Sequence, residues 1–170
     1  IGKPENDAQA KVQFDITIAG LNLKIDKSII YKSTDPVKGE VYRPLEILPP
    51  ATVNFTEKVI VFSDSPSKMI QLVIKANTTN VSGILKLNAP SGWTVKMKNA
   101  EFKLVAKDEE VIIDIEIVAD EKAEQAVLSA SLLIDGNTYS KSIKRIEYDH
   151  IPYQIILSDA ETKLINVDLK

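Results

Sequence analysis

The sequence contains no cysteine and a single histidine among its 170 residues. Disulfide bonds and thiolate metal sites are therefore excluded, and one imidazole cannot supply the two or three convergent ligands of a catalytic zinc site. Aromatic residues make up only 6% of the chain, so a hydrophobic core must rest on Ile, Val and Leu. The β-branched residues of this set favour strands, because they are stiff at the first side-chain torsion and pack well on a pleated surface.

Charge and hydropathy exclude further classes of protein. The formal net charge is −3, and no basic cluster of the kind that binds nucleic acid is present. No apolar run approaches the roughly 20 residues that span a bilayer. The glycines are isolated, so no phosphate-binding loop is present. We therefore expect no nucleic-acid partner, no membrane span and no cofactor in this chain.

The chain does contain a faint internal repeat. Residues 8–20 (AQAKVQFDITIAG) are echoed by residues 124–136 (EQAVLSASLLIDG), and the alternating apolar positions coincide when the terminal glycines are aligned. Each copy continues through a second strand to a tyrosine, Tyr31 or Tyr148, and then to an exit that contains proline. A unit that recurs once, with its front half missing the first time, indicates a chain cut from a longer run of β-domains.

Short segments of alternating apolar and polar residues, with turn signals about every 8–12 residues, predict an all-β fold. We expect an antiparallel immunoglobulin-like β-sandwich without the disulfide of antibody domains, preceded by the closing strands of a second, incomplete β-domain. The expected strands are 12–18, 21–25, 29–31, 53–55, 59–62, 70–74, 84–87, 93–97, 102–104, 111–117, 128–134, 139–148, 154–157 and 164–169. Residues 120–126 are the only stretch that resembles a helical turn.

Prolines place the domain boundary. Residues 33–50 carry four of them, and proline removes a backbone donor and fixes φ, so this stretch predicts an extended connector rather than a central strand. We divide the chain into residues 1–49, closing strands plus connector, and residues 50–170, the sandwich. A two-stranded remnant is marginal alone, so residues 12–25 should pack on the main sandwich or on a partner chain.

The connector holds the densest group of unusual residues. Asp35, Glu40 and Arg43 are candidates for a charge cluster, in which the Arg43 fork would hold a carboxylate and stiffen the joint between domains. A ligand-binding role for the same residues is the alternative, and no other feature of the sequence supports it.

Candidate catalytic groups are few. Asp149 and His150 are near neighbours in a connector, and the sequence favours a structural or surface role for this histidine. Glycosidases use two carboxylates across a cleft, about 5–10 Å apart, but the acidic run 108–110 sits in a turn. Asp114 and Glu116 share one strand face, and a solvated face explains them better. We therefore assign no catalytic and no metal-binding residue.

Trp93 is the candidate glycan contact, because the face of an indole ring suits the apolar face of a sugar. The alternative is that it caps the sandwich core after the Pro90-Ser91-Gly92 turn. Its position at the head of an alternating strand favours the core.

Two stretches resemble segments of large multidomain bacterial proteins of the LmbE-like (PIG-L) deacetylase family. They are DPVKGEVYRPLEILPPATVNF, residues 35–55, and IEYDHIPYQIILSDAETKLINVDL, residues 146–169. The middle, residues 84–119, resembles the sandwich domain associated with alpha-galactosidases and other carbohydrate-active enzymes. The matching positions there are Pro90, Gly92, Trp93, Phe102 and Leu104.

The deacetylase resemblance implies a parent with an N-terminal catalytic domain and a zinc site built from a His-Pro-Asp-Asp-type motif and a later histidine. None of that motif is in this chain, so no catalytic residue can be carried over. The resemblance implies the accessory β-region of an exported bacterial N-acetylglucosaminyl-type deacetylase, with any zinc held by the parent. The start of the chain, residues 1–9, is polar, so we expect the export signal upstream of it.

Three functions can be compared on the basis of the sequence. The first is a non-catalytic module that spaces or orients neighbouring domains of the same polypeptide. The second is a carbohydrate-binding module that grips glycan directly, which requires exposed aromatic residues. The third, an enzyme within this chain, lacks both nucleophile and ligands.

Overall fold

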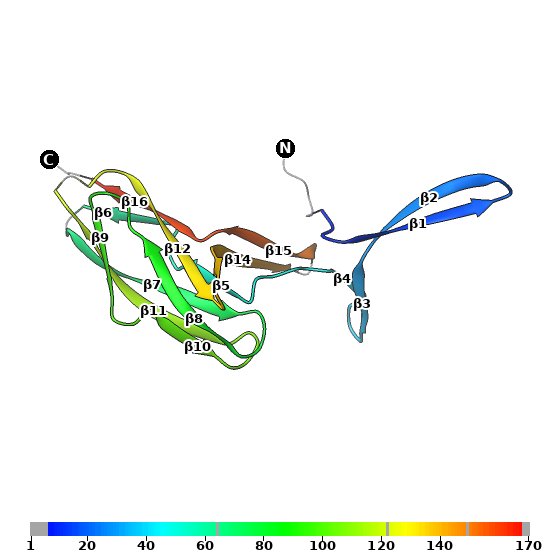
Figure 1. The fold of residues 1–170 in the computed structure, drawn as a ribbon, viewed down its shortest axis with the longest axis horizontal. Coiled ribbons are helices and arrows are strands. Elements are labelled where there is room, and N and C mark those ends of the chain that lie inside the picture. The colour runs from blue at the N-terminus through cyan, green and yellow to red at the C-terminus, as the bar shows by residue number, and fades with distance from the viewer. Residues whose placement is uncertain (1–6, 64, 122, 149, 168–170) are drawn as a thin grey trace. The chain divides into compact units, whose positions relative to one another are not determined.

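A computed structural model describes residues 7–63, 65–121, 123–148 and 150–167 (Figure 1). These residues form sixteen β-strands and no helix, which confirms the predicted all-β class. They divide into two compact units. The first comprises Ile1–Ile47 and Lys144–Ile156, and the second, the sandwich unit, comprises Leu48–Ile143 and Leu157–Lys170.

The sandwich unit consists of two β-sheets with a shared core. Its strands are β5 Ala51–Phe55, β6 Val59–Phe62, β7 Ser67–Ala76, β8 Val81–Asn88, β9 Trp93–Met97, β10 Glu101–Leu104, β11 Glu110–Ala119, β12 Ala126–Ile134, β13 Asn137–Tyr139 and β16 Glu161–Asn166. One sheet has the order β10–β8–β12–β16–β6, with β13 paired to β12, and the other has the order β5–β7–β11–β9. The predicted antiparallel sandwich is confirmed, although β6 and β16 pair in parallel.

Alternation in the sequence explains the core. β7 and β11 are antiparallel, and their register places Leu72 opposite Ile113 and Ile70 opposite Ile115 on the inner face. Leu72 and Ile115 are fully buried. Branched aliphatic pairs at directly opposed positions stabilise a sheet. β7 and β11 are also the two inner strands of the second sheet.

The first unit contains a hairpin of β1 (Lys11–Ile18) and β2 (Leu21–Ser28), followed by a two-stranded ribbon of β3 (Ile30–Asp35) and β4 (Gly39–Pro44). The ribbon replaces the extended connector that the prolines predicted. It tolerates them because Pro36 lies in the turn between the strands and Pro44 at the strand end, where a missing donor breaks no ladder.

A second ribbon, β14 (Lys141–Tyr148) with β15 (Ile151–Asp159), begins and ends in the sandwich unit and belongs to the first unit in between. The two units therefore meet in the sequence between Ile47 and Leu48, and Lys144–Ile156 belongs to the first unit. We predicted that residues 139–148 form one long strand that pairs with residues 128–134. This prediction is wrong, because, of the chain that follows the turn at Gly136, only the short β13 pairs with β12.

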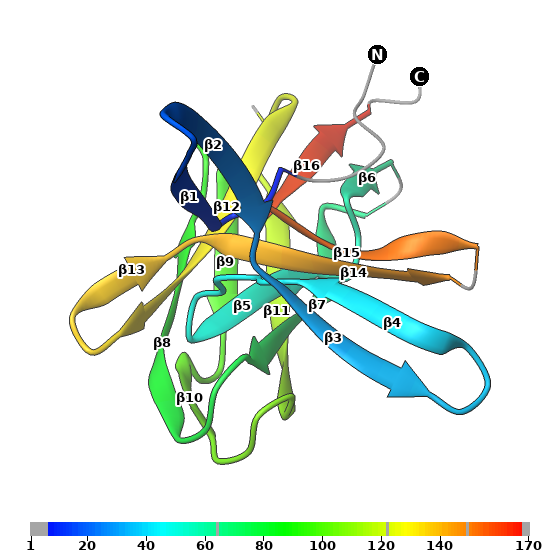
Figure 2. The same cartoon turned by 90° about the vertical axis from the view of Figure 1, so that its right-hand side faces the viewer.

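After Tyr139 the chain no longer pairs with β12, because the segment that contains Ala160 occupies the position beside β12. The amide of Ala130 donates to the carbonyl of Ala160 at 2.8 Å, and the amide of Ala160 donates to the carbonyl of Ser140 at 2.9 Å. Ala160 thus lies between β12 and the outgoing chain. Figure 2 shows how the chain continues from β13 into β14.

Residues 120–126 form one closed turn rather than a helix in their described part. The amide of Ala123 donates to the carbonyl of Asp120 at 2.9 Å, and the chain then enters β12. Lys122 lies outside the described residues.

A side chain of the edge strand β5 pairs with the backbone of Ile143, near the start of β14, as a neighbouring strand would. Asn54 donates from Nδ2 to the carbonyl of Ile143 at 2.7 Å, and the amide of Ile143 donates back to its Oδ1 at 3.1 Å. One amide side chain therefore satisfies both backbone groups of Ile143, where an unpaired edge would otherwise be open to other chains.

We expect Asn54→Asp to destabilise the sandwich by about 1–3 kcal/mol, because a carboxylate cannot donate and leaves the carbonyl of Ile143 facing an oxygen. Urea unfolding of the chain measures this loss. Asn88→Asp, at an exposed position at the end of β8, is the matched control and should change the unfolding free energy little. Equal losses in the two variants would contradict the role of Asn54.

Candidate functional site

Trp93, the candidate glycan contact, lies in the core of the sandwich unit. Its side chain is only 5% exposed, and its Nε1 donates to the carbonyl of Glu124 at 3.1 Å. The ring meets that of Phe62 edge to face, with centroids 4.9 Å apart. This arrangement satisfies the indole N–H and leaves no open ring face on which a sugar could stack.

Trp93 is the only tryptophan, so its fluorescence reports this site directly. We expect blue-shifted emission and little quenching by acrylamide, because the indole is shielded from water. Trp93→Ala should cost about 3–5 kcal/mol by opening a cavity, so it would not serve as a clean control in glycan-binding assays. Emission typical of a water-exposed indole, with free quenching, would contradict the buried position.

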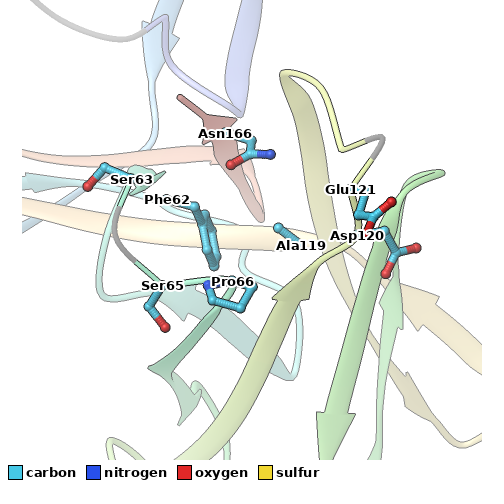
Figure 3. A pocket seen from close by; sticks show the side chains of 8 residues that line it. All are labelled: Phe62, Ser63, Ser65, Pro66, Ala119, Asp120, Glu121 and Asn166. Atoms are coloured by element: carbon cyan, nitrogen blue, oxygen red, sulfur yellow. The ribbon is translucent and has the colours of Figure 1, made fainter. Parts of the chain in front are cut away.

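A hollow adjoins this core at one end of the sandwich unit, where β6, β11 and β16 end (Figure 3). Its lining residues are Phe62, Ser63, Ser65, Pro66, Ala119, Asp120, Glu121 and Asn166. In the view of Figure 3, the two serines lie to one side of the Phe62 ring and the two carboxylates to the other.

The hollow combines carboxylates with hydroxyls, and the single histidine is not among its lining residues. Asn166 donates from Nδ2 to the carbonyl of Ala123 at 3.2 Å, so its amide is used to fasten the turn. Nowhere in the described part of the chain do three or more His, Asp or Glu side chains gather as they would around a metal ion. The hollow therefore offers a polar surface of hydroxyls, carboxylates and one amide beside the ring of Phe62.

The acidic run 108–110 closes the turn between β10 and β11. Glu109 accepts hydrogen bonds from the amides of Ala106 at 2.8 Å and Val105 at 2.6 Å, and these bonds hold the pKa of its carboxyl below the usual 4.5. Glu110 forms an ion pair with Lys75 at 2.7 Å. These contacts give the run a structural role.

Asp114 and Glu116 lie on the outer face of the second sheet. Asp114 accepts a hydrogen bond from Gln71 at 2.9 Å. Glu116 accepts one from the hydroxyl of Ser67 at 2.6 Å, and Lys96 lies 3.5 Å away. The Ser67 bond first, and the Lys96 charge second, lower the pKa of Glu116. Both carboxylates are thus engaged with neighbours on one sheet surface rather than opposed across a cleft.

Acid should weaken the Glu109 turn. Because the folded-state pKa of Glu109 lies below 4.5, its stabilisation is present above that value and is lost as pH falls through the folded pKa. We expect Glu109→Ala to be less stable than the parent chain at neutral pH, and the difference to shrink once pH falls below 4.5. Denaturant unfolding along a pH series measures it.

Glu57→Ala, at an exposed position between β5 and β6, controls for the loss of one surface charge. A difference between the parent chain and Glu109→Ala that stays constant across the series would contradict the assignment.

The predicted cluster of Asp35, Glu40 and Arg43 does not form, and the structure corrects it. Asp35 caps the β3–β4 turn by accepting from the amides of Lys38 and Val37, both at 2.8 Å, which lowers the pKa of its carboxyl. Its side chain therefore fastens its own turn.

Glu40 and Arg43 lie on opposite faces of β4, because side chains alternate along a strand and these two are three residues apart. Glu40 pairs with Lys32 at 2.6 Å and accepts from the hydroxyl of Tyr42. The Lys32 bond, followed by that of Tyr42, lowers the pKa of Glu40. A strand prediction for residues 39–44 would have placed Glu40 and Arg43 on opposite faces by alternation alone.

Arg43 instead contacts the second ribbon. Its guanidinium lies 3.2 Å from a carboxylate oxygen of Glu147 on β14, and its Cζ lies 4.9 Å from the ring centroid of Tyr153 on β15. Arg43 and Glu147 are 104 residues apart, and neither spacing nor residue type marks Glu147 as the partner among the other acids.

His150 is exposed near the tip of this second ribbon, with its ring centroid 5.9 Å from that of Tyr148. Asp149, its proposed companion, lies outside the described residues.

One surface of the β1–β2 hairpin is apolar. We call it the hairpin face; it consists of Val12, Phe14, Ile16, Ile18, Leu21, Leu23 and Ile25, which are 39–69% exposed. The register pairs Phe14 with Ile25 and Ile16 with Leu23, so the apolar side chains lie side by side. Each would contribute about 1.5–3 kcal/mol if it were fully buried. These side chains are exposed within the first unit, and their packing on the sandwich or on a partner stays a prediction.

Comparison with known proteins adds little. No protein-family model and no curated protein matches the chain. Among solved structures, it is similar to a FixG-related protein from Vibrio parahaemolyticus, at 12% identity and a TM-score of 0.45, over 70% of this chain and 98% of that one. It is also similar to the VesB protease of Vibrio cholerae, at 8% identity and a TM-score of 0.36, over 68% of this chain and 32% of that one. None of the described residues lies in a helix long and apolar enough to cross a membrane.

Proposed function

We propose that this chain is a non-catalytic β-sandwich module that spaces and orients neighbouring domains of a larger polypeptide. One observation carries the proposal: Arg43 on the first ribbon contacts both strands of the second ribbon, through Glu147 and Tyr153. The two ribbons follow the two copies of the internal repeat. A joint between them is therefore a joint between successive repeats.

The order of elements supports this interpretation. The hairpin β1–β2 precedes the ribbon β3–β4, and the hairpin β12–β13 precedes the ribbon β14–β15. Units that recur in this way contact their neighbours in sequence, and their stability comes partly from those neighbour contacts. Each further repeat would add another pair of touching ribbons.

The strength of the contact suits an orienting role. Arg43 and Glu147 have side chains that are 48% and 64% exposed, so their ion pair contributes about 0–1 kcal/mol. The cation–π contact with Tyr153 adds about 0.5–1 kcal/mol at an exposed site. The joint thus selects one arrangement of the ribbons without contributing much to the stability of the fold.

We further propose that the parent is an exported bacterial, carbohydrate-active protein, a zinc-dependent N-acetylglucosaminyl-type deacetylase whose catalytic domain lies outside this chain. The support is the resemblance of residues 35–55 and 146–169 to that family. These two stretches contain all of β4 and most of the second ribbon, the elements that Arg43 joins.

Direct glycan binding is the second candidate. Its support moves from Trp93 to the first unit, where Tyr31, Tyr42 and Tyr148 are 66%, 49% and 64% exposed. Exposed phenol rings can stack on sugars. Retention of the chain on an insoluble polysaccharide, lost in Tyr31→Ala, would favour this candidate over the spacer.

We expect Arg43→Gln to loosen the joint while the sandwich keeps its stability. Amide exchange over β4 and residues 144–156 should accelerate roughly fivefold, the factor that corresponds to about 1 kcal/mol, and Glu147→Gln should have a similar effect. Raising the salt concentration should reduce the difference, because the pair is exposed. Hydrogen exchange followed by mass spectrometry provides the measurement.

Lys32→Gln is the matched control, since Lys32 pairs with Glu40 on the other face of the same ribbon. It should leave exchange over residues 144–156 unchanged. In the intact polypeptide, Arg43→Gln should also broaden the distance distribution between spin labels in adjacent domains. An unchanged distribution, or equal exchange in the two variants, would refute the orienting role.

A further inference from the structure

The β1–β2 hairpin has two chemically distinct faces. The hairpin face carries the apolar side chains, while the other face carries polar pairs such as Asp15 opposite Lys24 and Gln13 opposite Asp26. On that polar face the hydroxyl of Thr17 also bonds the side chain of its partner, Asn22, at 2.7 Å. Lys27, opposite Val12, is the one charged residue on the apolar side. Such a division is typical of a strand pair with one face in water and one face in a core.

The second copy of the repeat shows what covers such a face. Under the alignment of residues 8–20 with 124–136, the apolar positions of β1 correspond to positions of β12 that are at most 4% exposed, namely Leu128, Ala130, Leu132 and Ile134. They belong to the core that β12 shares with the sheet β5–β7–β11–β9.

The turns of the two hairpins agree as well. Ala19 and Gly20 have φ values of 50° and 82°, and Asp135 and Gly136 have φ values of 48° and 79°. Both are two-residue turns with positive φ at each central position, the geometry that matches the twist of paired strands. The two hairpins therefore begin from the same local structure, and the second is covered by a sheet of its own unit.

We propose that the hairpin face is the inner surface of half a β-sandwich, and that its occupant is the aliphatic inner face of an antiparallel sheet preceding Ile1 in the same polypeptide. The order of the second copy places this sheet upstream. All four strands that face β12 lie between Ala51 and Ala119, before β12 begins at Ala126. A hairpin that closes its sandwich from the C-terminal side needs partners that precede it.

The side chains also define the shape of the occupant. Phe14 stands where the second copy has Ala130, so the first sandwich must accommodate a much larger side chain at this position. Because protein cores are close-packed, the occupant should present a small residue or a gap opposite Phe14. Elsewhere the aligned residues are of similar size, and the occupant should offer Ile, Val or Leu.

This inference rests on the hairpin and goes beyond the ribbon joint. Arg43 plays no part in it, so Arg43→Gln should leave the contacts of the hairpin face unchanged. Failure of one proposal is therefore distinguishable from failure of the other.

A photo-crosslinking amino acid tests the occupant in the intact polypeptide. Placed at Ile16, p-benzoylphenylalanine should crosslink to residues upstream of Ile1 within the same molecule, at alternating positions of aliphatic strands. Placed at Thr17, on the polar face, it should give none of these products. Peptide mapping identifies the sites, and a mixture of light and heavy isotope-labelled protein separates intramolecular from intermolecular products.

Several results would overturn the proposal. Crosslinks from Ile16 into Leu48–Ile143 would place the hairpin on its own sandwich. Mixed-isotope products would show a second copy as the occupant, and products with another protein would show a separate partner. The absence of any product specific to Ile16 would show that nothing covers the face.

Amide exchange gives a second measurement that does not need a bulky probe. In the intact polypeptide, exchange over Val12–Ile25 should be at least tenfold slower than in Ile16→Lys, which places a charge in the interface. Thr17→Lys is the matched control and should keep the protection of the parent. Rapid exchange over these residues in the unmodified polypeptide would contradict the proposal.

Discussion

The packing of aliphatic side chains between two β-sheets is the interaction on which the sandwich depends. Residues such as Leu72, Ile115, Leu128 and Leu132 are fully buried, and they come from both sheets. Each strand contributes every second side chain to this core, so polar residues between them reach the surface. The same alternation explains why the carboxylates of Asp114 and Glu116 lie on an outer face, where they accept hydrogen bonds from Gln71 and Ser67.

The core that covers β12 also provides a comparison for the apolar face of the β1–β2 hairpin. A hairpin with the same turn geometry and the same apolar positions is stable in the second copy because a facing sheet covers it. In the first copy the side chains are equally apolar and remain 39–69% exposed. Apolar surface that is arranged in rows on a regular strand pair is typical of a surface that another element covers, and this is the basis of the proposed facing sheet. The repeat thus connects a packing rule to the organisation of a longer polypeptide.

The prolines predicted an extended connector over residues 33–50, whereas the structure has the ribbon β3–β4 in the first part of this stretch. They indicated a connector because proline cannot donate a hydrogen bond in a central strand. A two-stranded ribbon has free outer edges, however, and accepts proline at its ends. Trp93 followed the alternation of its strand and lies in the core, as that alternation favoured. The expected Asp35, Glu40 and Arg43 cluster failed because its residues were grouped by closeness in sequence, whereas strand geometry sends Glu40 and Arg43 to opposite faces.

The amino-acid sequence by itself determined the all-β class, most strand positions and the scarcity of reactive groups, because each of these depends on residue type and on a period of two. Only the tertiary structure decided which distant residues meet. Arg43 with Glu147, Asn54 with Ile143 and Ala160 beside β12 are contacts between segments far apart in the chain. Local periodicity contains no information on such partners, since a strand with one set of side chains can pair with any neighbour that topology brings beside it.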